Sequence, residues 1–208
     1  MRIADAPRAW ADKGAAAIIE ASDIAAILLA AGASRRFGTS DKLAAPLAGE
    51  PLALHAARRI VNLAPGYRIA VCPDIDGVLA RQLAALGFDI IANPDSDRGL
   101  SHSLALGIAA AAEGRAAAAL ICLADMPFVG IGHLRAILTR FDTATAPVVA
   151  STNGTAAMPP ALFARAHFDR LRARQGDRGG KALLADAVLV AARADELADI
   201  DRPEDLRD

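Results

Sequence analysis

The sequence predicts an α/β fold in which a mostly parallel sheet carries helices on both faces. Residues 24–31, Ile-Ala-Ala-Ile-Leu-Leu-Ala-Ala, form an apolar run without polar alternation, as expected of a strand that is covered on both faces. Similar short apolar runs recur along the chain between stretches with helical spacing, and this alternation is typical of βαβ units. Hydrophobic residues make up 54% of the chain but aromatic residues only 4%, so we expect an aliphatic core.

The individual elements follow from the same patterns. Apolar residues at helical spacing predict a helix over 51–64, with Pro51 in its first turn, and further helices over 77–86 and 102–112. Later strands are expected where short apolar runs recur, at 67–72, 88–92, 117–123, 148–151 and 187–191. The region 143–160 is richer in Thr, Gly and Pro, and we expect it to be a loop near the substrate.

Length and charge limit the organisation and the partners. A chain of 208 residues fits one domain and buries roughly 70% of its unfolded surface. We expect a single domain over residues 24–208, preceded by an N-terminal extension, residues 1–23, that is helical or disordered and has no assigned function. The net charge is −1, from 23 basic and 24 acidic residues, which gives no field for attracting a polynucleotide. A mononucleotide partner is compatible with this balance.

The cysteines, histidines and apolar runs exclude several kinds of site. Cys72 and Cys122 stand alone in apolar surroundings, without zinc-binding spacing, so we expect two buried, reduced thiols. The longest apolar run is too short to cross a bilayer as a helix, and no signal-peptide core is present, so we expect a cytoplasmic protein without a membrane segment. The histidines lack metal or triad spacing, and we expect surface or helix-face positions for them, with His102 alone near the site: they are His55, His102, His133 and His167.

A glycine-bearing basic loop follows the first strand. Gly32 and Gly38 permit positive φ and close backbone approach, and the basic side chains between and after them supply positive charge, ending with Lys42. The carboxyl end of a strand is where open α/β sheets bind ligands, so we expect a triphosphate here. The spacing fits neither the dinucleotide fingerprint nor the P-loop. An ordinary strand-to-helix turn with solvated basic residues is the alternative.

Asp125 stands directly after another buried run, 119–124, and is followed by Met-Pro. It therefore projects from the same carboxyl edge as the basic loop. A carboxylate beside a triphosphate suits Mg²⁺, which takes oxygen ligands from one or two carboxylates, phosphates and water. The alternative is that Asp125 caps the helix after Pro127.

The loop also carries a family resemblance. Leu-Ala-Ala-Gly-Ala-Ser-Arg-Arg-Phe-Gly at 29–38, followed by Asp-Lys-Leu at 41–43, resembles the signature of nucleotidyltransferases that act on molybdopterin, within the MobA-like NTP transferase family. It is most similar to the molybdenum cofactor cytidylyltransferase branch. The resemblance implies a three-layer, Rossmann-like nucleotidyltransferase fold from about residue 24 onwards. It also implies catalytic roles for Lys42, Arg36 and Asp125, and nucleotide contacts from Ala30, Ala31, Gly32, Ala33, Ser34, Arg35 and Gly38.

Two further segments resemble parts of the same family. Leu-Ala-Asp-Met-Pro at 123–127 resembles the metal motif, and Asp-Ile-Asp-Arg-Pro-Glu-Asp-Leu at 199–206 resembles the family's ending, with Arg202 in place of threonine. The resemblance implies that Asp125 and Asp201 bind the Mg²⁺ cofactor together. For Asp201 the alternative is a helix N-cap ahead of Pro203.

The remaining two segments concern the nucleoside and the acceptor. Residues 93–107 are similar to the family's base and ribose segment, which implies nucleotide contacts from Asn93, Gly99, Ser101 and Ser103. Helix capping is the alternative for each serine. Residues 175–184 resemble the acceptor element, which implies acceptor contacts from Gly176, Asp177, Arg178 and Lys181, with a solvated turn as the alternative.

The resemblance implies transfer of a nucleotidyl group from an NTP to the phosphate of molybdopterin, with release of pyrophosphate. Ala31 stands where the guanylyl branch has glycine, which favours CTP over GTP. The recipient of the product is expected to be a molybdoenzyme or its maturation factor. Residues 154–163 depart from the family's usual pattern on the acceptor side, so transfer to a sugar phosphate or an isoprenoid alcohol phosphate stays an alternative. So does a non-catalytic nucleotide-binding partner of a molybdoenzyme.

Overall fold

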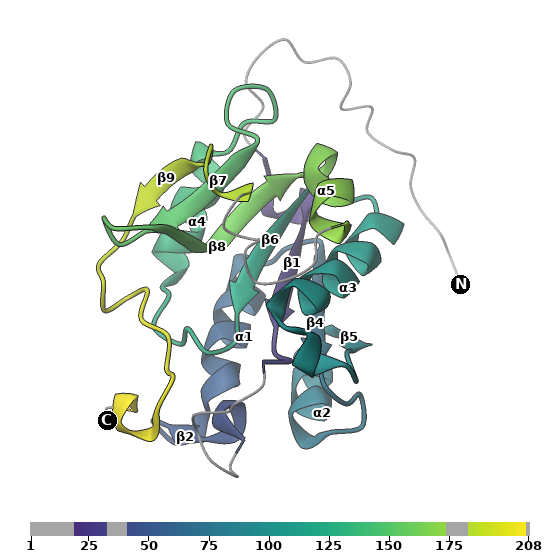
Figure 1. Ribbon diagram of the computed structural model, residues 1–208, viewed down its shortest axis with the longest axis vertical. Coiled ribbons are helices and arrows are strands. Elements are labelled where there is room, and N and C mark those ends of the chain that lie inside the picture. Colours follow the sequence, from purple (N-terminus) through teal and green to yellow (C-terminus); the bar gives the residue numbers. More distant parts are fainter. Residues whose placement is uncertain (1–18, 33–40, 174–182, 207–208) are drawn as a thin grey trace.

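A computed structural model describes residues 19–32, 41–173 and 183–206. In this part of the chain seven strands form one sheet in the order β5-β4-β1-β6-β8-β7-β9, and a two-stranded hairpin, β2-β3, stands apart from it (Figure 1). The strands of the large sheet are β1 Ile24–Leu29, β4 Tyr67–Cys72, β5 Asp89–Ala92, β6 Ala118–Leu123, β7 Val148–Thr152, β8 Ala157–Ala164 and β9 Val188–Ala191. The hairpin consists of β2 Pro46–Leu47 and β3 Glu50–Pro51.

The sheet is mostly parallel, which confirms the predicted fold class. Strands β5, β4, β1 and β6 pair in parallel, and β9 pairs in parallel with β7. Only β8 runs antiparallel to its two neighbours, β6 and β7. The carboxyl ends of β1, β4, β5 and β6 therefore meet at one edge, where the β2-β3 hairpin also lies (Figure 1).

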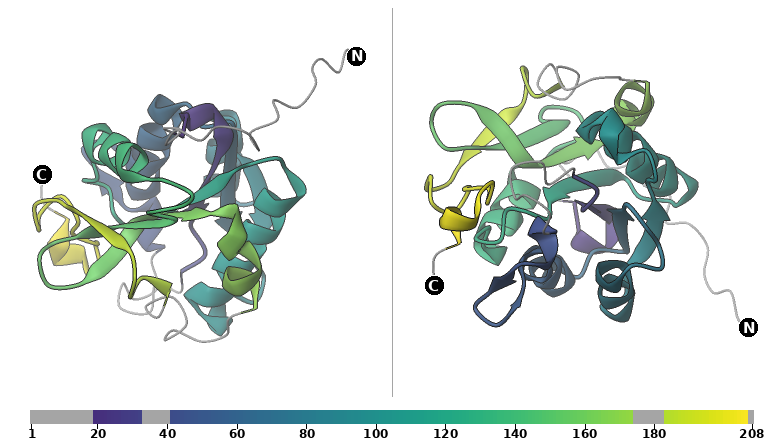
Figure 2. Two further views of the ribbon diagram at one scale, coloured as in Figure 1. Left: turned by 90° about the horizontal axis from the view of Figure 1, so that it is seen from above. Right: turned by 60° about the horizontal axis from the view of Figure 1, so that its bottom comes forward.

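Helices cover both faces of the sheet (Figure 2). They are α1 Leu52–Leu63, α2 Val78–Ala85, α3 Leu100–Glu113, α4 Ile131–Arg140 and α5 Phe168–Arg172. Helices α1, α2 and α4 pack into one apolar cluster, while α3 and α5 pack into a second cluster on the opposite face. The predicted helices over 51–64, 77–86 and 102–112 are confirmed as α1, α2 and α3, with ends that differ by no more than two residues.

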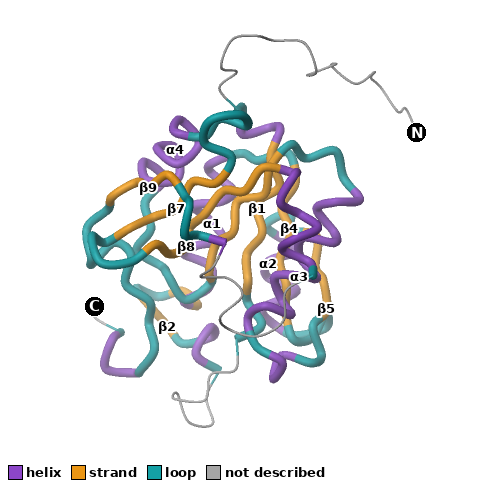
Figure 3. Tube along the Cα trace, turned by 45° about the horizontal axis from the view of Figure 1, so that its top comes forward, coloured by secondary structure: helices purple, strands orange, loops and turns teal. Residues whose placement is uncertain are grey.

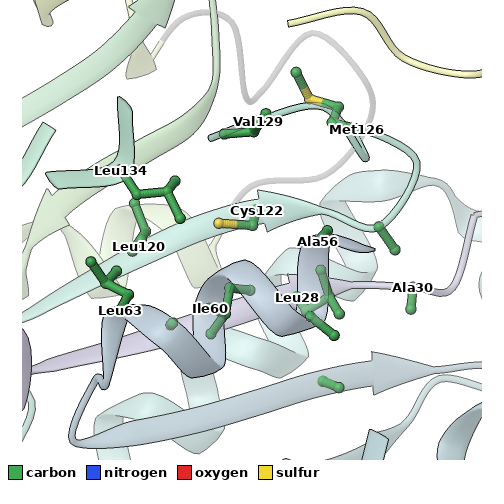
Figure 4. Close-up of a cluster of buried hydrophobic side chains, with 14 of the residues drawn as sticks. Leu28, Ala30, Ala56, Ile60, Leu63, Leu120, Cys122, Met126, Val129 and Leu134 are labelled. Carbon is green, nitrogen blue, oxygen red and sulfur yellow. The ribbon is translucent and has the colours of Figure 1, made fainter. Parts of the chain in front are cut away.

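Strand β1 explains why its sequence shows no polar alternation. All six of its residues are buried, and successive side chains enter opposite clusters: Leu28 and Ala30 pack with α1 and α2, whereas Ile27 and Ala31 pack on the α3 side. Figure 4 shows Leu28 beside Ile60 of α1, with Ala30 farther along the chain after β1. On the other face α3 lies so close that a Cβ at Gly107 would come within 2.6 Å of Ile27 Cγ2. The lack of a side chain at Gly107 permits this approach.

The expectation of a loop over 143–160 was wrong for its last part. Residues Ala157–Ala164 form β8, and its apolar run was hidden by Pro159 and Pro160, which cannot donate ladder hydrogen bonds. The register with β7 shifts between Ala150 and Ser151, and this irregularity accommodates both prolines. Strand β8 thus fills the centre of the sheet although its sequence argues against a central strand.

The residues before β1 join the core in part. Ile19 is buried against the α1 cluster, and a short 3-10 helix at Ala21–Asp23 leads into β1. The domain boundary at residue 24 therefore lies inside the packed structure, and residues 1–18 of the expected extension lie outside the described part. No helix among the described residues combines the length and the apolar character needed to cross a membrane.

Both cysteines are buried and unpaired, as predicted. Burial raises the pKa of the Cys72 thiol to about 11 and that of Cys122 to about 12. Because the thiolate is the reactive form, a disulfide reagent at pH 8 should modify the two thiols slowly in the folded protein. After the protein is unfolded in guanidinium, the reagent should modify both thiols at once. Rapid release of two chromophore equivalents from the native protein would contradict this slow modification.

The raised pKa values also predict how stability depends on pH. The contribution of the buried thiols to the free energy of unfolding is complete below the ordinary cysteine pKa of about 8.5 and falls as the pH rises towards 11.

Candidate active site

Three charged side chains from distant parts of the chain meet at the carboxyl edge of the sheet. The ammonium nitrogen of Lys42 donates to Asp125 Oδ2 at 2.8 Å and to Asp201 Oδ1 at 3.3 Å. The Lys42 side chain is only 12% exposed, against 23% for Asp125 and 40% for Asp201. The predicted catalytic lysine and the two predicted metal carboxylates therefore form one cluster.

Lys42 is positioned by a short, well-anchored turn. It begins a 3-10 helix, Lys42–Ala44, whose N-cap is Asp41; the Asp41 carboxylate accepts a hydrogen bond from Leu43 N at 3.0 Å. Leu43 is buried in the core, and Ala45 O accepts from Leu52 N at the start of α1. With the following side chain anchored in the core, Lys42 projects over the ends of the strands.

Asp125 lies just beyond β6, next to the end of β1. Ala124 N donates to Leu29 O at 3.1 Å, so the chain leaves β6 alongside β1. The alternative role as a helix cap is wrong, because α4 begins at Ile131 and its N-cap is Gly130. The second carboxylate oxygen, Asp125 Oδ1, is buried and has no hydrogen-bond partner among the described residues. A buried anionic oxygen without a partner is costly, which suggests that it serves a ligand.

Asp201 reaches the cluster because the backbone before it is bound to Asp125. Ile200 N donates to Asp125 O at 2.9 Å, and the Ile200 side chain is buried. The alternative of an N-cap at Asp201 is also wrong: the N-cap of the following 3-10 helix, Pro203–Asp205, is Arg202. Figure 3 shows this C-terminal turn at the same end of the molecule as the β2-β3 hairpin.

The electrostatics of the cluster favour a charged lysine. Burial alone would lower the pKa of Lys42, but its charge interactions and hydrogen bonds with Asp125 and Asp201 outweigh burial and raise it above the ordinary value of 10.5. Asp199 lies close enough for its pKa to be raised, first by burial and then by the negative charges of Asp201 and Asp125. Within the described part of the chain, two carboxylates thus share the positive charge of Lys42.

The described end of the nucleotide loop is Gly32. Its neighbours Ala30 and Ala31 are buried, whereas Gly32 is exposed. Gly32 does not use the positive φ that glycine permits, and a Cβ there would meet no atom of the described residues within 4 Å. The packing of these described residues therefore does not require glycine at this position. The other loop residues predicted to act, Ala33, Ser34, Arg35, Arg36 and Gly38, lie outside the described residues.

A cavity of about 570 Å³ opens beside this loop, at the carboxyl ends of β1 and β4. Its lining includes Ala30, Gly32, Asp41, Cys72, Asp74 and Val78. Its volume lies in the range of small-molecule sites, and its walls are mainly apolar, with the two carboxylates of Asp41 and Asp74 among the lining residues. It lies next to Lys42, since both neighbours of that residue, Asp41 and Leu43, line it.

Comparison with known proteins identifies the family. Residues 26–196 match the model of the MobA-like NTP transferase domain. The chain belongs to this family. It is a nucleotidyltransferase, and its predicted membership of the family is confirmed. Asp201 lies five residues beyond the matched range, so its place beside Lys42 comes from the structure.

Two relatives and several solved structures are similar to this MobA-like transferase. It is 31% identical over 196 residues to the purine catabolism protein PucB of Bacillus subtilis (strain 168), covering 86% of this chain and 92% of PucB. It is 33% identical over 127 residues to the bifunctional protein GlmU of Sphingopyxis alaskensis, covering 61% of this chain but 28% of GlmU.

The solved structures share the fold. Rv0371c from Mycobacterium tuberculosis H37Rv has a TM-score of 0.74 at 23% identity, covering 90% of this chain and 96% of that one. Molybdopterin-guanine dinucleotide biosynthesis protein A from Archaeoglobus fulgidus has a TM-score of 0.65 at 18% identity, covering 88% and 94%. Rv0371c has also been solved in complex with manganese; that structure has a TM-score of 0.65 at 20% identity, covering 83% and 89%.

In this MobA-like transferase, only part of the predicted nucleoside-binding segment is exposed to solvent. Asn93 and Ser103 are almost fully buried and bind each other, with Asn93 Nδ2 donating to Ser103 Oγ at 2.8 Å. Gly99 has a φ of +87° and is the N-cap of α3, so the two serines lie within the helix and not at its cap. Asn93 and Ser103 thus tie β5 to α3, and their contact with a nucleotide, like that of Ser101, stays a prediction.

The predicted acceptor-binding residues fall in a part of the chain that the structure does not describe. Gly176, Asp177, Arg178 and Lys181 lie outside the described residues, so their roles stay predictions.

Among the histidines, His133 lies on a helix, one of the two predicted kinds of position: it is on the buried face of α4, and its Nε2 lies 2.8 Å from Ser151 Oγ. Ser151 Oγ donates to Pro160 O at 2.7 Å, so the imidazole is the donor to Ser151. Burial lowers the pKa of His133, although nearby Glu196 opposes this effect.

Two carboxylates near the cluster were missed in the sequence. Asp205 Oδ2 accepts from the backbone nitrogens of Asp201, at 3.0 Å, and Arg202, at 2.8 Å. Its position at the third residue of a helical turn is a capping signal that the sequence does carry. Glu196 Oε1 accepts from Gly130 N at 3.0 Å, and no local pattern around Glu196 indicates this contact.

Proposed function

We propose that this MobA-like transferase moves a nucleotidyl group, CMP from CTP in preference, to the phosphate of a molybdopterin-type acceptor and releases pyrophosphate. The observation that carries the proposal is the single ammonium group of Lys42 held between Asp125 and Asp201 at the ligand-binding edge of the sheet. The similarity to a molybdopterin-guanine dinucleotide biosynthesis protein supports the acceptor class. A molybdoenzyme or its maturation factor would receive the product.

The residues of the cluster fit a hard divalent cation. Asp125 and Asp201 offer carboxylate oxygens, and the buried Asp125 Oδ1 has no other partner among the described residues. These residues contain no group of three or more His, Cys, Asp or Glu side chains arranged for a metal, so phosphate and water oxygens would complete the coordination. The related structure with manganese supports a divalent metal in this family. We propose Mg²⁺, held by Asp125 and Asp201.

The chemistry requires positioning and charge. An acceptor phosphate oxygen attacks the α-phosphorus of the NTP, one P–O bond forms, and the bond to the β-phosphate oxygen breaks as pyrophosphate leaves. Lys42, whose raised pKa keeps it charged, would stabilise the negative charge that grows on the phosphate oxygens, and Arg36 would assist. A bound Mg²⁺ would supply further charge neutralisation on the triphosphate. No protein nucleophile takes part.

The proposed choice of base rests on Ala31, which stands where the guanylyl branch has glycine. The Ala31 methyl group is buried in the apolar cluster between β1 and α3, next to the end of the strand, so its effect on a bound base would come through this packing. One methyl group changes selectivity by about 1–3 kcal/mol, which is enough for a preference for CTP over GTP.

A different acceptor is the second candidate function. Two observations favour it: the partial match to GlmU, and a full-length relative, PucB, that is named for purine catabolism. The same cluster would then serve transfer to another phosphate group.

One experiment tests the proposal and its rival together. The purified protein is incubated with Mg²⁺, each of the four NTPs and either molybdopterin or a sugar phosphate as acceptor, and pyrophosphate release is measured. We expect release with CTP, less with GTP, and none without the acceptor. Release only with a sugar phosphate as acceptor would support the second function. Silence with every pair would instead indicate a non-catalytic binding protein.

Gly32→Ala should separate ligand binding from folding. A Cβ at Gly32 meets no described atom and the backbone is unstrained, so we expect an unchanged melting temperature or a small rise, equivalent to about 0.4–1 kcal/mol. If the triphosphate approaches the backbone there, the methyl group should weaken CTP binding, measured by calorimetry, by about 1–3 kcal/mol. Gly132→Ala, at the start of α4, also places its Cβ near no described atom within 4 Å and is the matched control. Equal CTP affinity in both variants would argue against a backbone cradle at Gly32.

A further inference from the structure

The C-terminal segment, residues 193–206, crosses the edge of the sheet and carries Asp201 to the cluster. In Figure 1 it runs from β9 past the loop after β6 to the terminal turn. This segment contains no helix or strand before Pro203. Regular backbone pairing therefore does not fix the position of Asp201, and individual contacts must do so.

Two hydrogen bonds connect this segment to the loop between β6 and α4. Glu196 Oε1 accepts from Gly130 N at 3.0 Å, and Ile200 N donates to Asp125 O at 2.9 Å. The two bonds thus join both ends of one short stretch, 196–200, to the two ends of the loop 125–130. The first uses a side chain and can be removed by substitution, whereas the second uses only backbone atoms.

Burial holds the stretch between these two points. Leu197 and Ile200 are 4% and 1% exposed and belong to the core cluster that contains α1 and α4. Beyond Ile200, the Asp205 carboxylate accepts from the nitrogens of Asp201 and Arg202, so the terminal turn is a compact unit. Asp201 can therefore move relative to Asp125 only together with this terminal turn.

We propose that Glu196 is a positioning residue for Asp201: its bond to Gly130 holds the C-terminal segment in the register that places the Asp201 carboxylate beside Asp125 and Lys42. The proposal rests on the proposed function in one respect, the role of Asp201 as a metal ligand. The contact is close, since a Cβ on Gly130 would lie 3.1 Å from Glu196 Oε1. Glycine at 130 thus leaves room for the carboxylate to reach the backbone.

Glu196 also lies at the N-terminus of α4, where a negative charge stabilises a helix. A purely structural role of this kind predicts lower stability without any specific effect on the metal. The positioning role predicts faster amide hydrogen exchange at Ile200 and weaker metal binding. Glu196→Gln separates the two, because the amide oxygen can still accept from Gly130 N while the charge is lost.

The test compares full-length Glu196→Ala and Glu196→Gln proteins with wild type. The control is Arg193→Ala, which removes an exposed ion pair with Asp195 on the same segment. Amide hydrogen exchange at Ile200 and Asp201 is measured first, without any ligand. Binding of Mn²⁺ in the presence of CTP is then followed by electron paramagnetic resonance of the free ion.

We expect Glu196→Ala to accelerate amide exchange at Ile200 and to weaken Mn²⁺ binding about 10-fold. The KM for CTP should change by a smaller factor than the Mn²⁺ affinity. Glu196→Gln and Arg193→Ala should stay close to wild type. Unchanged exchange and Mn²⁺ affinity in Glu196→Ala would overturn the positioning role, as would an equal loss in Glu196→Gln. A parallel Asp201→Ala arm keeps the two ideas apart: if it binds Mn²⁺ normally, the metal assignment fails, whatever the exchange data show at Glu196.

Discussion

Replacing Asp125 with asparagine should reduce the rate of nucleotidyl transfer by a factor of about 10²–10³ or more, the loss typical of one strong electrostatic contact at a reacting phosphate. Asparagine keeps the size of the side chain but removes the charge that binds a cation and pairs with Lys42 at 2.8 Å. The turnover number is measured from pyrophosphate release at saturating NTP and Mg²⁺.

The fold should survive this change. The bond from Ile200 N is to the backbone oxygen of Asp125, so it does not depend on the side chain. Asp169→Asn, at a carboxylate that is 97% exposed on α5, is a suitable control and should be indistinguishable from wild type. Near-normal turnover in Asp125→Asn, with a normal melting temperature, would rule out the metal role of Asp125.

Lys42→Met is the second substitution for which we expect a large effect. Methionine preserves the apolar stem of this largely buried side chain but removes the ammonium group that bridges Asp125 and Asp201. We expect the turnover number to fall by about 10²–10³, because no other cation among the described residues pairs with both carboxylates. Arg172→Met, which removes an exposed ion pair on α5, provides the matched control.

The pH dependence of stability gives an independent check on Lys42. Its pKa is raised in the folded protein, so the ion pairs contribute fully to stability below the ordinary value of 10.5. That contribution is lost as the pH rises through the folded-state pKa. Denaturant unfolding should therefore show a stability loss at strongly alkaline pH that is smaller in Lys42→Met. An identical alkaline profile in both proteins, or retained turnover in the variant, would contradict the role given to Lys42.

Much of the fold could be predicted because burial leaves a simple pattern in the chain. Strands covered on both faces, such as β1 and β6, appear as apolar runs, and α1 shows helical spacing on its buried face. Strand β8 could not be predicted in this way. Its two prolines are tolerated because they lie where the pairing with β7 passes from the Ala150 and Ala161 pair to the Ser151 and Met158 pair, and that register shift exists only in the folded sheet.

The site was predictable to the extent that strand ends define it. Asp125 and Lys42 could be placed at one edge because both follow buried strands in a parallel sheet. The nearness of Asp201 was implied only by family resemblance. Asn93 and Ser103 have side chains suited to a nucleotide, yet in the structure they bind each other.

The sequence by itself determined the α/β class, the layers, the family and the edge of the sheet at which we expect the chemistry. These properties depend on local periodicity and short motifs, which are present in consecutive residues. Only the tertiary structure decided that one lysine bridges two aspartates, that Asp205 holds the terminal turn, and that Glu196 binds the start of α4. Each of these contacts depends on how the chain crosses the edge of the sheet. Side-chain and backbone groups far apart in the sequence meet there through packing, which leaves no periodic signal in either segment.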